Sequence, residues 1–246
     1  MADDLKIVGT DITKFYGKTQ VLFDLSFEIE LNQRGVVGLI GPNGAGKSTI
    51  MRLLSGITTL SAGDLTLVNS TNTVELGPWS RSNSFYAPAG ERGLRNKLTV
   101  MDNLKYFSAL RRDNYEQVSQ NAVHYAELLN ANTLLAKEFG KLSTGQKKKA
   151  EIIVAVSLNT KLLILDEPST GLDINAQEDL MDLIDTIAQM HEKKIIISSH
   201  DPNFIAKSVN QYLFVSAGRI VKTVPKQMTE EMLVAQYKSL FGVVEK

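Results

Sequence analysis

The chain has 246 residues, of which 43% are hydrophobic, so it can bury the core of one larger domain or two small ones. Its 27 basic and 27 acidic side chains cancel, which argues against a protein whose main task is to hold nucleic acid, because that task needs a basic surface. The absence of cysteine excludes a disulfide framework and a thiolate metal site.

The chain begins Met-Ala-Asp-Asp, which is acidic and unlike the start of a secretory signal. No stretch approaches the roughly 18 apolar residues that are needed to span a bilayer. We therefore expect a cytoplasmic chain that acts at a membrane only through another protein.

The first part of the chain is predicted to form strands. Two stretches alternate apolar and polar residues, as half-buried strands do, and a third is a continuous apolar run typical of a fully buried strand. Shorter strand-like stretches follow. We predict strands at Leu5–Thr13, Val21–Leu31, Val36–Ile40, Leu65–Val68 and Ser84–Tyr86.

The middle of the chain changes to helical spacing. Between Val100 and Ser157 the apolar residues recur at intervals typical of a helix. The positions that carry this pattern are Leu104, Phe107, Leu110, Val123, Ala126, Leu128 and Leu129. We expect a helical insertion in this region.

Strands return after the insertion and alternate with helices. We predict buried strands at Leu162–Leu165 and Ile195–Ile197 with a helix at Ala176–Met190 between them. A closing hairpin joins Val209–Val215 to Arg219–Val224, and an amphipathic helix covers Thr229–Phe241. This alternation implies parallel βαβ units and an α/β fold.

A glycine-rich loop follows the predicted strand Val36–Ile40 and precedes a helical pattern at Thr49–Ser55. Its residues match G-x-x-x-x-G-K-[ST] and are Gly41, Pro42, Asn43, Gly44, Ala45, Gly46, Lys47 and Ser48, with Thr49 next. Such a loop turns its N–H groups toward phosphate oxygens. Lys47 can then neutralise phosphate charge, and Ser48 can bind Mg²⁺. The alternative is a glycine-rich turn beside an exposed lysine.

Two carboxylates, Asp166 and Glu167, directly follow the apolar strand Leu162–Leu165. They lie where the carboxyl ends of parallel strands place ligands. We predict that Asp166 serves Mg²⁺, directly or through water, and that Glu167 orients the attacking water. His200 ends a strand at the same edge. The alternatives are a strand running into a polar turn and a structural histidine.

A second serine–glycine element, Leu142–Gln146, opens a helix. Ser143 and Gln146 have the spacing of a helix-capping box. The same helix N-terminus, with a serine hydroxyl and the bare backbone of Gly145, also suits a γ-phosphate. The local sequence supports both interpretations, and we interpret the lysines at 147–149 as a solvated charge run.

Together these elements resemble the ATP-binding cassette (ABC) family, over essentially the whole chain. The matching motifs are Walker A at Gly41–Thr49, the signature at Leu142–Gln146, Walker B at Leu162–Glu167 and the D-loop at Ser169–Asp173. His200 matches the family's switch histidine, and Tyr16 resembles the aromatic residue that stacks on adenine.

The resemblance implies an α/β fold with a P-loop NTPase parallel-sheet core, an antiparallel β subdomain and an inserted helical subdomain. It implies a single domain over residues 1–246, with the core at 1–90 and 158–246 and the helical subdomain near 91–157. The implied cofactors are ATP and Mg²⁺. Glu167, His200 and Lys47 are the implied catalytic residues, and Ser48 and Asp166 serve the metal.

The resemblance also implies partners. Two ATP-binding subunits, as a homodimer or a heterodimer, would enclose two ATP molecules head to tail, and we expect the homodimer. One subunit would contribute Tyr16 and the loop Gly41–Thr49 to each ATP site. The other subunit would contribute Ser143, Gly145, Gln146 and Asp173 to the same site. A separate transmembrane permease subunit would hold the pair at the inner face of the cell membrane. No nucleic-acid partner is expected.

The sequence departs from the family between Tyr86 and Leu94, where the usual glutamine is absent. This text resembles the ABC-2-type exporter subgroup, in which an acidic residue sometimes replaces the glutamine. We therefore expect Glu91 to sense Mg²⁺, and Leu94 with its basic neighbours to contact the permease within the segment 87–98.

Three alternatives to an exporter subunit are considered. A non-transport ABC ATPase would usually carry two cassettes or long coiled-coil arms, and many importer subunits carry an extra C-terminal domain. A non-catalytic cassette would be expected to lose Lys47 or Glu167, and both are present. Thr144 stands where the signature most often has glycine, a change that we expect to be compatible with activity.

Overall fold

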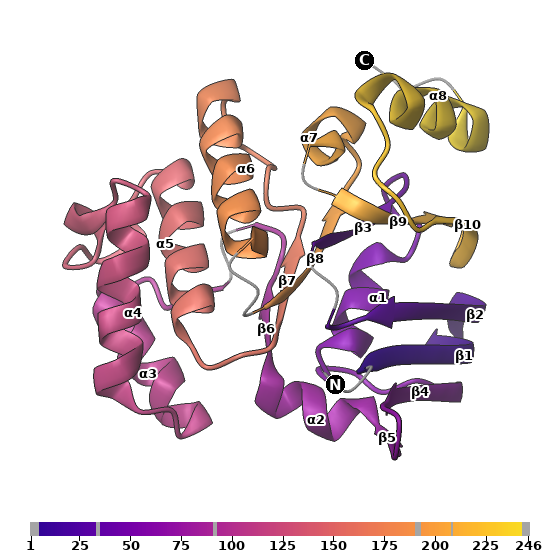
Figure 1. Cartoon of the computed structure of the whole chain (residues 1–246), viewed down its shortest axis with the longest axis horizontal. Coiled ribbons are helices and arrows are strands. Elements are labelled where there is room, and N and C mark those ends of the chain that lie inside the picture. The colour runs from indigo at the N-terminus through magenta and orange to yellow at the C-terminus, as the bar shows by residue number, and fades with distance from the viewer. Residues whose placement is uncertain (1–4, 33–34, 91–92, 190–192, 208, 243–246) are drawn as a thin grey trace.

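Two β-sheets form the framework of the protein, whose computed structural model describes residues 5–32, 35–90, 93–189, 193–207 and 209–242. One sheet has six strands in the order β10-β9-β3-β8-β7-β6, and the other has four in the order β2-β1-β4-β5 (Figure 1). Helices cover the larger sheet, and the smaller sheet lies at the opposite side of the molecule from α3, α4 and α5.

The larger sheet contains the parallel strands. In order along the chain its strands are β3 (Val36–Ile40), β6 (Ser84–Ala87), β7 (Leu162–Asp166), β8 (Lys194–Ser199), β9 (Val209–Ser216) and β10 (Arg219–Val224). Every pair is parallel except the β9–β10 hairpin. All residues of β3, β7 and β8 are buried, because helices and the second sheet cover both faces. Because these strands are parallel, their carboxyl ends lie at one edge of the sheet, and the predicted site residues lie at this edge.

The smaller sheet is antiparallel and comprises β1 (Lys6–Tyr16), β2 (Thr19–Glu30), β4 (Ala62–Val68) and β5 (Thr73–Glu75). Its strands bury alternate residues such as Ile7, Leu25, Ile29 and Leu67, because one face packs on the core and the other meets solvent. This face shares a core with β3 and with the helix α1 (Lys47–Leu54). The antiparallel sheet thus supports the glycine-rich loop from one side.

A helical segment lies between β6 and β7. It contains α3 (Val100–Arg111), α4 (Tyr115–Leu128), α5 (Thr144–Ser157) and short 3-10 turns at Asn132–Leu134 and Phe139–Lys141. Side chains cap all the α-helices of this segment: Thr99 caps α3, Asn114 caps α4 and Ser143 caps α5. Each cap accepts a hydrogen bond from an otherwise unpaired N–H of the first turn, so these boundaries are set locally.

The remaining helices complete the layers. The helix α2 (Leu76–Asn83) precedes β6, α6 (Ile174–Gln189) joins β7 to β8, and α7 (Pro202–Ala206) follows β8. The terminal helix α8 (Glu230–Phe241) packs against α7, with Leu233 and Tyr237 buried. None of the described helices is both long enough and apolar enough to cross a bilayer.

The predicted fold class is confirmed, and the predicted strands and helices lie within a few residues of the observed ones. The strand β5 and the helices α2 and α7 were not predicted. Three residues that carried the helical spacing, Leu110, Val123 and Leu128, are exposed, because that spacing also continues onto the outer faces of α3 and α4.

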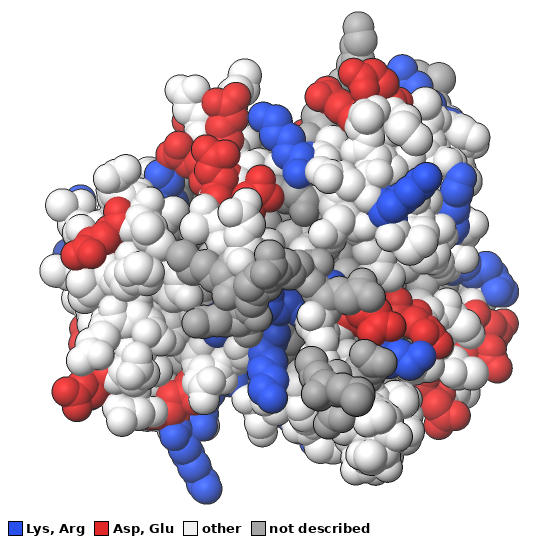
Figure 2. All heavy atoms as spheres, viewed as in Figure 1, with Lys and Arg blue, Asp and Glu red and all other residues white. Residues whose placement is uncertain are grey.

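The interpretation of residues 147–149 as a solvated run is wrong at Lys148, which is 5% exposed. Its amino group lies 3.1 Å from the Glu151 carboxylate and 3.2 Å from the Gly90 carbonyl. Elsewhere the charges are well mixed: Figure 2 shows acidic and basic side chains interspersed over the face in view, with no broad basic surface.

Candidate functional site

The glycine-rich loop runs from the end of β3 to the start of α1 and depends on its glycines. A side chain at Gly41 would place its Cβ 2.0 Å from the Val215 carbonyl oxygen, so only glycine fits there. Gly46 has a φ of 106° and is the residue before α1, a left-handed conformation that favours glycine. The loop and the first turn of α1 line a pocket of about 350 Å³ with residues 43–49, Val21, Ala89 and Glu167.

Lys47 is buried beneath this loop, with 5% of its surface exposed. Its amino group donates to the carbonyls of Gly41, at 2.7 Å, and Pro42, at 3.1 Å. It also lies 3.3 Å from Glu167 Oε1. The structure therefore holds a buried cation at the base of the pocket, paired with the carboxylate that the sequence places after β7.

Glu167 lies at the centre of the site. Its backbone has a φ of 46°, a left-handed conformation uncommon for a residue other than glycine, and its N–H donates to Ser198 Oγ at 2.9 Å. Its Oε2 atom lies 2.8 Å from His200 Nδ1. Sequence reasoning named Lys47, Glu167 and His200 separately, and the structure brings them together.

Asp166 is the last residue of β7 and is 2% exposed. Its Oδ1 accepts a hydrogen bond from Ser198 Oγ at 2.6 Å, and its Oδ2 accepts one from the Tyr86 hydroxyl at 2.8 Å. Burial, and next the charge of Asp166, raise the pKa of the Tyr86 phenol above its ordinary value of 10.0.

Sequence reasoning missed Tyr86 and Ser198 as site residues. The available signal was positional. Tyr86 is one residue from the end of β6, and Ser198 is one residue from the end of β8. Asp166 pairs in register with Ser198 across the parallel strands. Asp166 lies at the end of β7, so polar residues at the ends of the two neighbouring strands were candidates for contact with it. This rule would have indicated both Tyr86 and Ser198.

The donor set suits Mg²⁺, which prefers oxygen ligands and keeps few protein ligands when it also binds phosphate. Ser48 offers a hydroxyl in the pocket, and Asp166 offers a carboxylate at the neighbouring strand end. Among the described residues, no group of three or more His, Asp or Glu could hold a metal ion unaided. A metal shared between these two side chains and a phosphate fits this arrangement.

The signature residues lie in a different place. Ser143 and Gln146 form the capping box of α5, with each side chain bonded to the other residue's N–H. They line a groove of about 460 Å³ with Gly145, Asp173 and the start of α6. Asp173 Oδ1 accepts from the Ala176 N–H. This groove is distinct from the pocket that Lys47 lines.

Tyr16 ends β1, and 42% of its surface is exposed. The Lys14 amino group lies 5.0 Å from the centre of one face of the ring. Tyr86 chiefly, and Tyr16 further, raise the pKa of Arg52 on α1 above its ordinary value by hydrogen bonding and charge interaction.

The segment after β6 differs from expectation. Glu91 lies outside the described residues, so its predicted role stays a prediction. Leu94 is 5% exposed and belongs to the main core, so the prediction that it contacts a permease is wrong. The exposed residues after Leu94 are Arg95, Asn96 and Lys97, and the Arg95 guanidinium lies 4.2 Å from the centre of the Tyr106 ring.

Comparison with known proteins places this site in a family. The family model described as ABC transporter matches residues 22–170. An uncharacterised ABC transporter ATP-binding protein of Methanocaldococcus jannaschii is 32% identical over 216 residues, which cover 88% of this chain and 76% of the relative. The thiamine import ATP-binding protein ThiQ of Escherichia coli is 30% identical over 239 residues, 95% of this chain and 97% of the relative.

A solved ATP-binding subunit of an ABC transporter has a similar fold. Its TM-score to this chain is 0.78 at 22% identity, over 94% of this chain and 99% of that one. The sequence comparisons thus agree with the structure, in which the phosphate loop, the acidic end of β7 and the capped helix α5 form the site. The chain belongs to the ABC transporter family of ATP-binding proteins.

Proposed function

We propose that this chain is the ATP-hydrolysing subunit of an ABC transporter and converts ATP and water to ADP and phosphate. The observation that carries the proposal is that Glu167, which lines the pocket with residues 43–49, contacts both Lys47 and His200. A cation, a carboxylate and an imidazole are the groups needed to stabilise phosphate charge and to orient water.

Each residue has a distinct role in this proposal. The N–H groups of residues 43–49 and the Lys47 amino group bind the phosphates. Glu167 accepts a hydrogen bond from the attacking water and polarises it, and His200 fixes the Glu167 carboxylate through its 2.8 Å contact. Ser48 and Asp166 would hold Mg²⁺, which would neutralise phosphate charge. Tyr16 supplies a stacking surface for the base.

A second ATP-binding subunit completes the site in this proposal. Ser143, Gly145, Gln146 and Asp173 line their own groove, separate from the pocket at Lys47. A head-to-tail homodimer would bring that groove of one subunit over the pocket of the other. The N-terminus of α5 is the positive end of the helix dipole, which suits the γ-phosphate of the partner's ATP.

We propose a transmembrane permease as the further partner, holding the subunit at the inner face of the membrane. Residues 91–157 would form the helical subdomain, and the segment 87–98 would dock through its exposed residues Arg95 and Lys97. Export is supported by the resemblance of this segment to ABC-2-type exporters. The likeness to a thiamine import protein makes import the competing direction, and the membrane protein that co-purifies with the chain would decide.

The central test is Glu167→Gln. The variant keeps the size of the side chain and removes its charge, so we expect ATP binding to persist and turnover to fall by about 10²–10⁴-fold. Steady-state phosphate release, measured with the membrane partner present, gives the answer. Glu127→Gln, at an exposed position on α4, is the matched control and should turn over like wild type. Turnover by Glu167→Gln within threefold of wild type would remove Glu167 from the mechanism.

A further inference from the structure

Tyr86 reaches the proposed metal ligand from a neighbouring strand. It lies on β6 and pairs in register with Ile164 of β7, and its hydroxyl crosses to Asp166, two residues further along. The two oxygen atoms are 2.8 Å apart. The tyrosine is half-buried, and Asp166 is 2% exposed. This contact therefore lies in a region of low dielectric, where a hydrogen bond to a charged group is strong.

The direction of this hydrogen bond is fixed by chemistry. An ionised carboxylate only accepts hydrogen bonds, so the Tyr86 hydroxyl must give its single proton to Asp166. The Arg52 guanidinium, which interacts with the same tyrosine, has donors only and so does not compete for this proton.

Ser198 repeats this arrangement from the other side. Its hydroxyl lies on β8, is fully buried, and donates to Asp166 Oδ1 at 2.6 Å. Its lone pair accepts the Glu167 N–H at 2.9 Å. Each oxygen of the Asp166 carboxylate thus accepts one hydrogen bond from a hydroxyl, and the two hydroxyls lie on the strands on either side of β7. A carboxylate bonded in this way cannot rotate about its Cβ–Cγ bond without breaking both contacts.

We infer that Tyr86 is a positioning residue that fixes the orientation of the Asp166 carboxylate toward Mg²⁺. The inference rests on the proposed function, because it takes Asp166 as a metal residue. A carboxylate has about four lone-pair positions, so one on each oxygen remains available to a metal or to its bound water. Tyr86 and Ser198 together determine where those positions point.

The experiment compares Tyr86→Phe with wild type in metal-dependent nucleotide binding. A fluorescent ATP analogue is titrated into the protein at a series of Mg²⁺ concentrations and again in EDTA. Loss of such a supporting hydrogen bond typically weakens metal binding by about 10–100-fold. We expect the half-saturating Mg²⁺ concentration to rise by that factor, while binding in EDTA stays as in wild type. Steady-state hydrolysis should regain much of its rate at high Mg²⁺.

Tyr212→Phe is the matched control. Tyr212 is also a buried tyrosine, but among the described residues its hydroxyl bonds to the backbone alone, at the Val209 carbonyl and the Met228 N–H. This variant should lose stability and keep the wild-type dependence on Mg²⁺. The comparison separates loss of a buried hydroxyl in general from loss of the one at Asp166.

Ser198→Ala provides a second variant in case Tyr86→Phe folds poorly. It removes the other proton from Asp166 and should also raise the half-saturating Mg²⁺ concentration. If a folded Tyr86→Phe protein, or failing that a folded Ser198→Ala protein, keeps the wild-type Mg²⁺ dependence, the positioning role is wrong. If wild type itself binds the analogue equally well with Mg²⁺ and with EDTA, it is the proposed metal site that fails.

Discussion

At the scale of single residues, the site is organised by pairs of buried opposite charges. Lys47 is held by Glu167 and two backbone carbonyls at the base of the pocket. A phosphate that reaches Lys47 must therefore compete with a carboxylate already in place. We expect Glu167→Gln to bind ATP at least as tightly as wild type, since glutamine leaves the lysine charge uncompensated.

A second buried pair lies outside the pocket. Lys148 and Glu151 are 5% and 3% exposed, and within the described part of the chain Glu151 Oε1 has no hydrogen-bond partner. A Cβ built at Gly93 would lie 1.6 Å from this oxygen. The segment after β6 therefore packs directly on α5 through a charged side chain. The spacing of three residues between Lys148 and Glu151 on a helix predicts an ion pair. It does not predict that the pair is buried, because burial depends on the distant segment that covers it.

Glu151 makes a testable contribution to the dependence of stability on pH. Burial raises the pKa of its carboxyl above the ordinary 4.5, although Lys148 opposes the shift. Because the pKa is higher in the folded protein, the protonated carboxyl contributes to folding stability, and this contribution is complete below pH 4.5. The contribution is lost as the pH rises through the pKa of the folded protein. Glu151→Gln cannot ionise, so its stability relative to wild type should increase as the pH rises through this window.

Urea denaturation at several pH values measures this difference. The exposed Glu127→Gln variant is measured in the same way as the control. A pH-independent difference between Glu151→Gln and wild type would mean that the Glu151 carboxyl titrates alike in the folded and unfolded protein.

At the scale of elements, continuous apolar runs were the most reliable guide. Val36–Ile40 is the strand β3 as observed, and Leu162–Leu165 differs from β7 by one residue, because a strand buried on both faces leaves no polar interruption. The missed β5 is three exposed residues, and the missed α2 contains a glycine and a proline. Their formation depends on the neighbours they pair with or pack against, which local sequence does not contain.

The caps of α3 and α5 give an element-scale prediction that separates structure from function. Thr99 with Asp102, and Ser143 with Gln146, form equivalent capping boxes. Replacing either cap residue by alanine should cost about 1 kcal/mol of folding stability, since one N–H loses its partner. Only Ser143→Ala should also lower ATP hydrolysis, because only that serine faces the partner's nucleotide in the proposed dimer.

Thermal or urea unfolding gives the stability of the two variants, and phosphate release gives their activity. This pair resolves the two interpretations that the local sequence left open at Ser143. Equal losses of activity in Thr99→Ala and Ser143→Ala would leave the serine with a capping role alone.

At the scale of the whole molecule, the separate positions of the two half-sites predict an ATP-dependent change of mass. Without nucleotide we expect the isolated chain to be mostly monomeric. With Mg-ATP, Glu167→Gln should form a dimer, because each subunit then supplies the groove that completes the other's pocket. Light scattering with and without Mg-ATP measures this, and Lys47→Ala, which loses phosphate binding, is the control. One unchanged mass for Glu167→Gln would contradict the head-to-tail pair.

The sequence predicted the fold and the main residues of the pocket because these belong to contiguous motifs. It did not predict the contacts between Tyr86, Asp166 and Ser198, which come from three strands brought together only by sheet register. Nor did it predict the burial of Leu94. Such features depend on pairings between distant segments, and a single sequence shows each segment alone.

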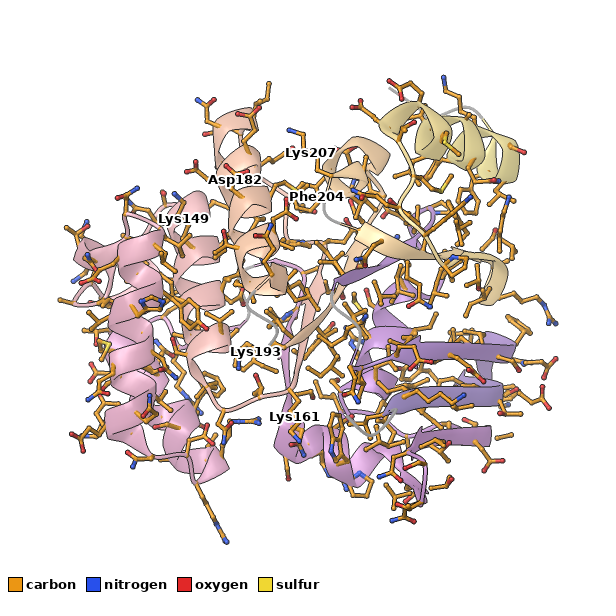
Figure 3. The ribbon with its side chains drawn as sticks, in the orientation of Figure 1. Lys149, Lys161, Asp182, Lys193, Phe204 and Lys207 are labelled. Carbon is orange, nitrogen blue, oxygen red and sulfur yellow. The ribbon has the colours of Figure 1, made fainter. Side chains whose placement is uncertain are left out.

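The helical segment is attached to the sheet at opposite ends of two neighbouring parallel strands. It leaves the sheet after Ala87, at the edge that carries the site, and returns before Leu162, at the opposite edge. The strands are in register there, so these attachments are separated by about 10 Å along the strand direction. At the return, the Lys193 side chain, labelled in Figure 3, donates to the carbonyls of Leu158 and Thr160.

This geometry links the phosphate pocket to α5. The departing connection places Ala89 in the pocket, and the carbonyl of its next residue, Gly90, accepts a hydrogen bond from Lys148 of α5 at 3.2 Å. A ligand that displaced Ala89 would therefore act on the same helix that begins beside Ser143.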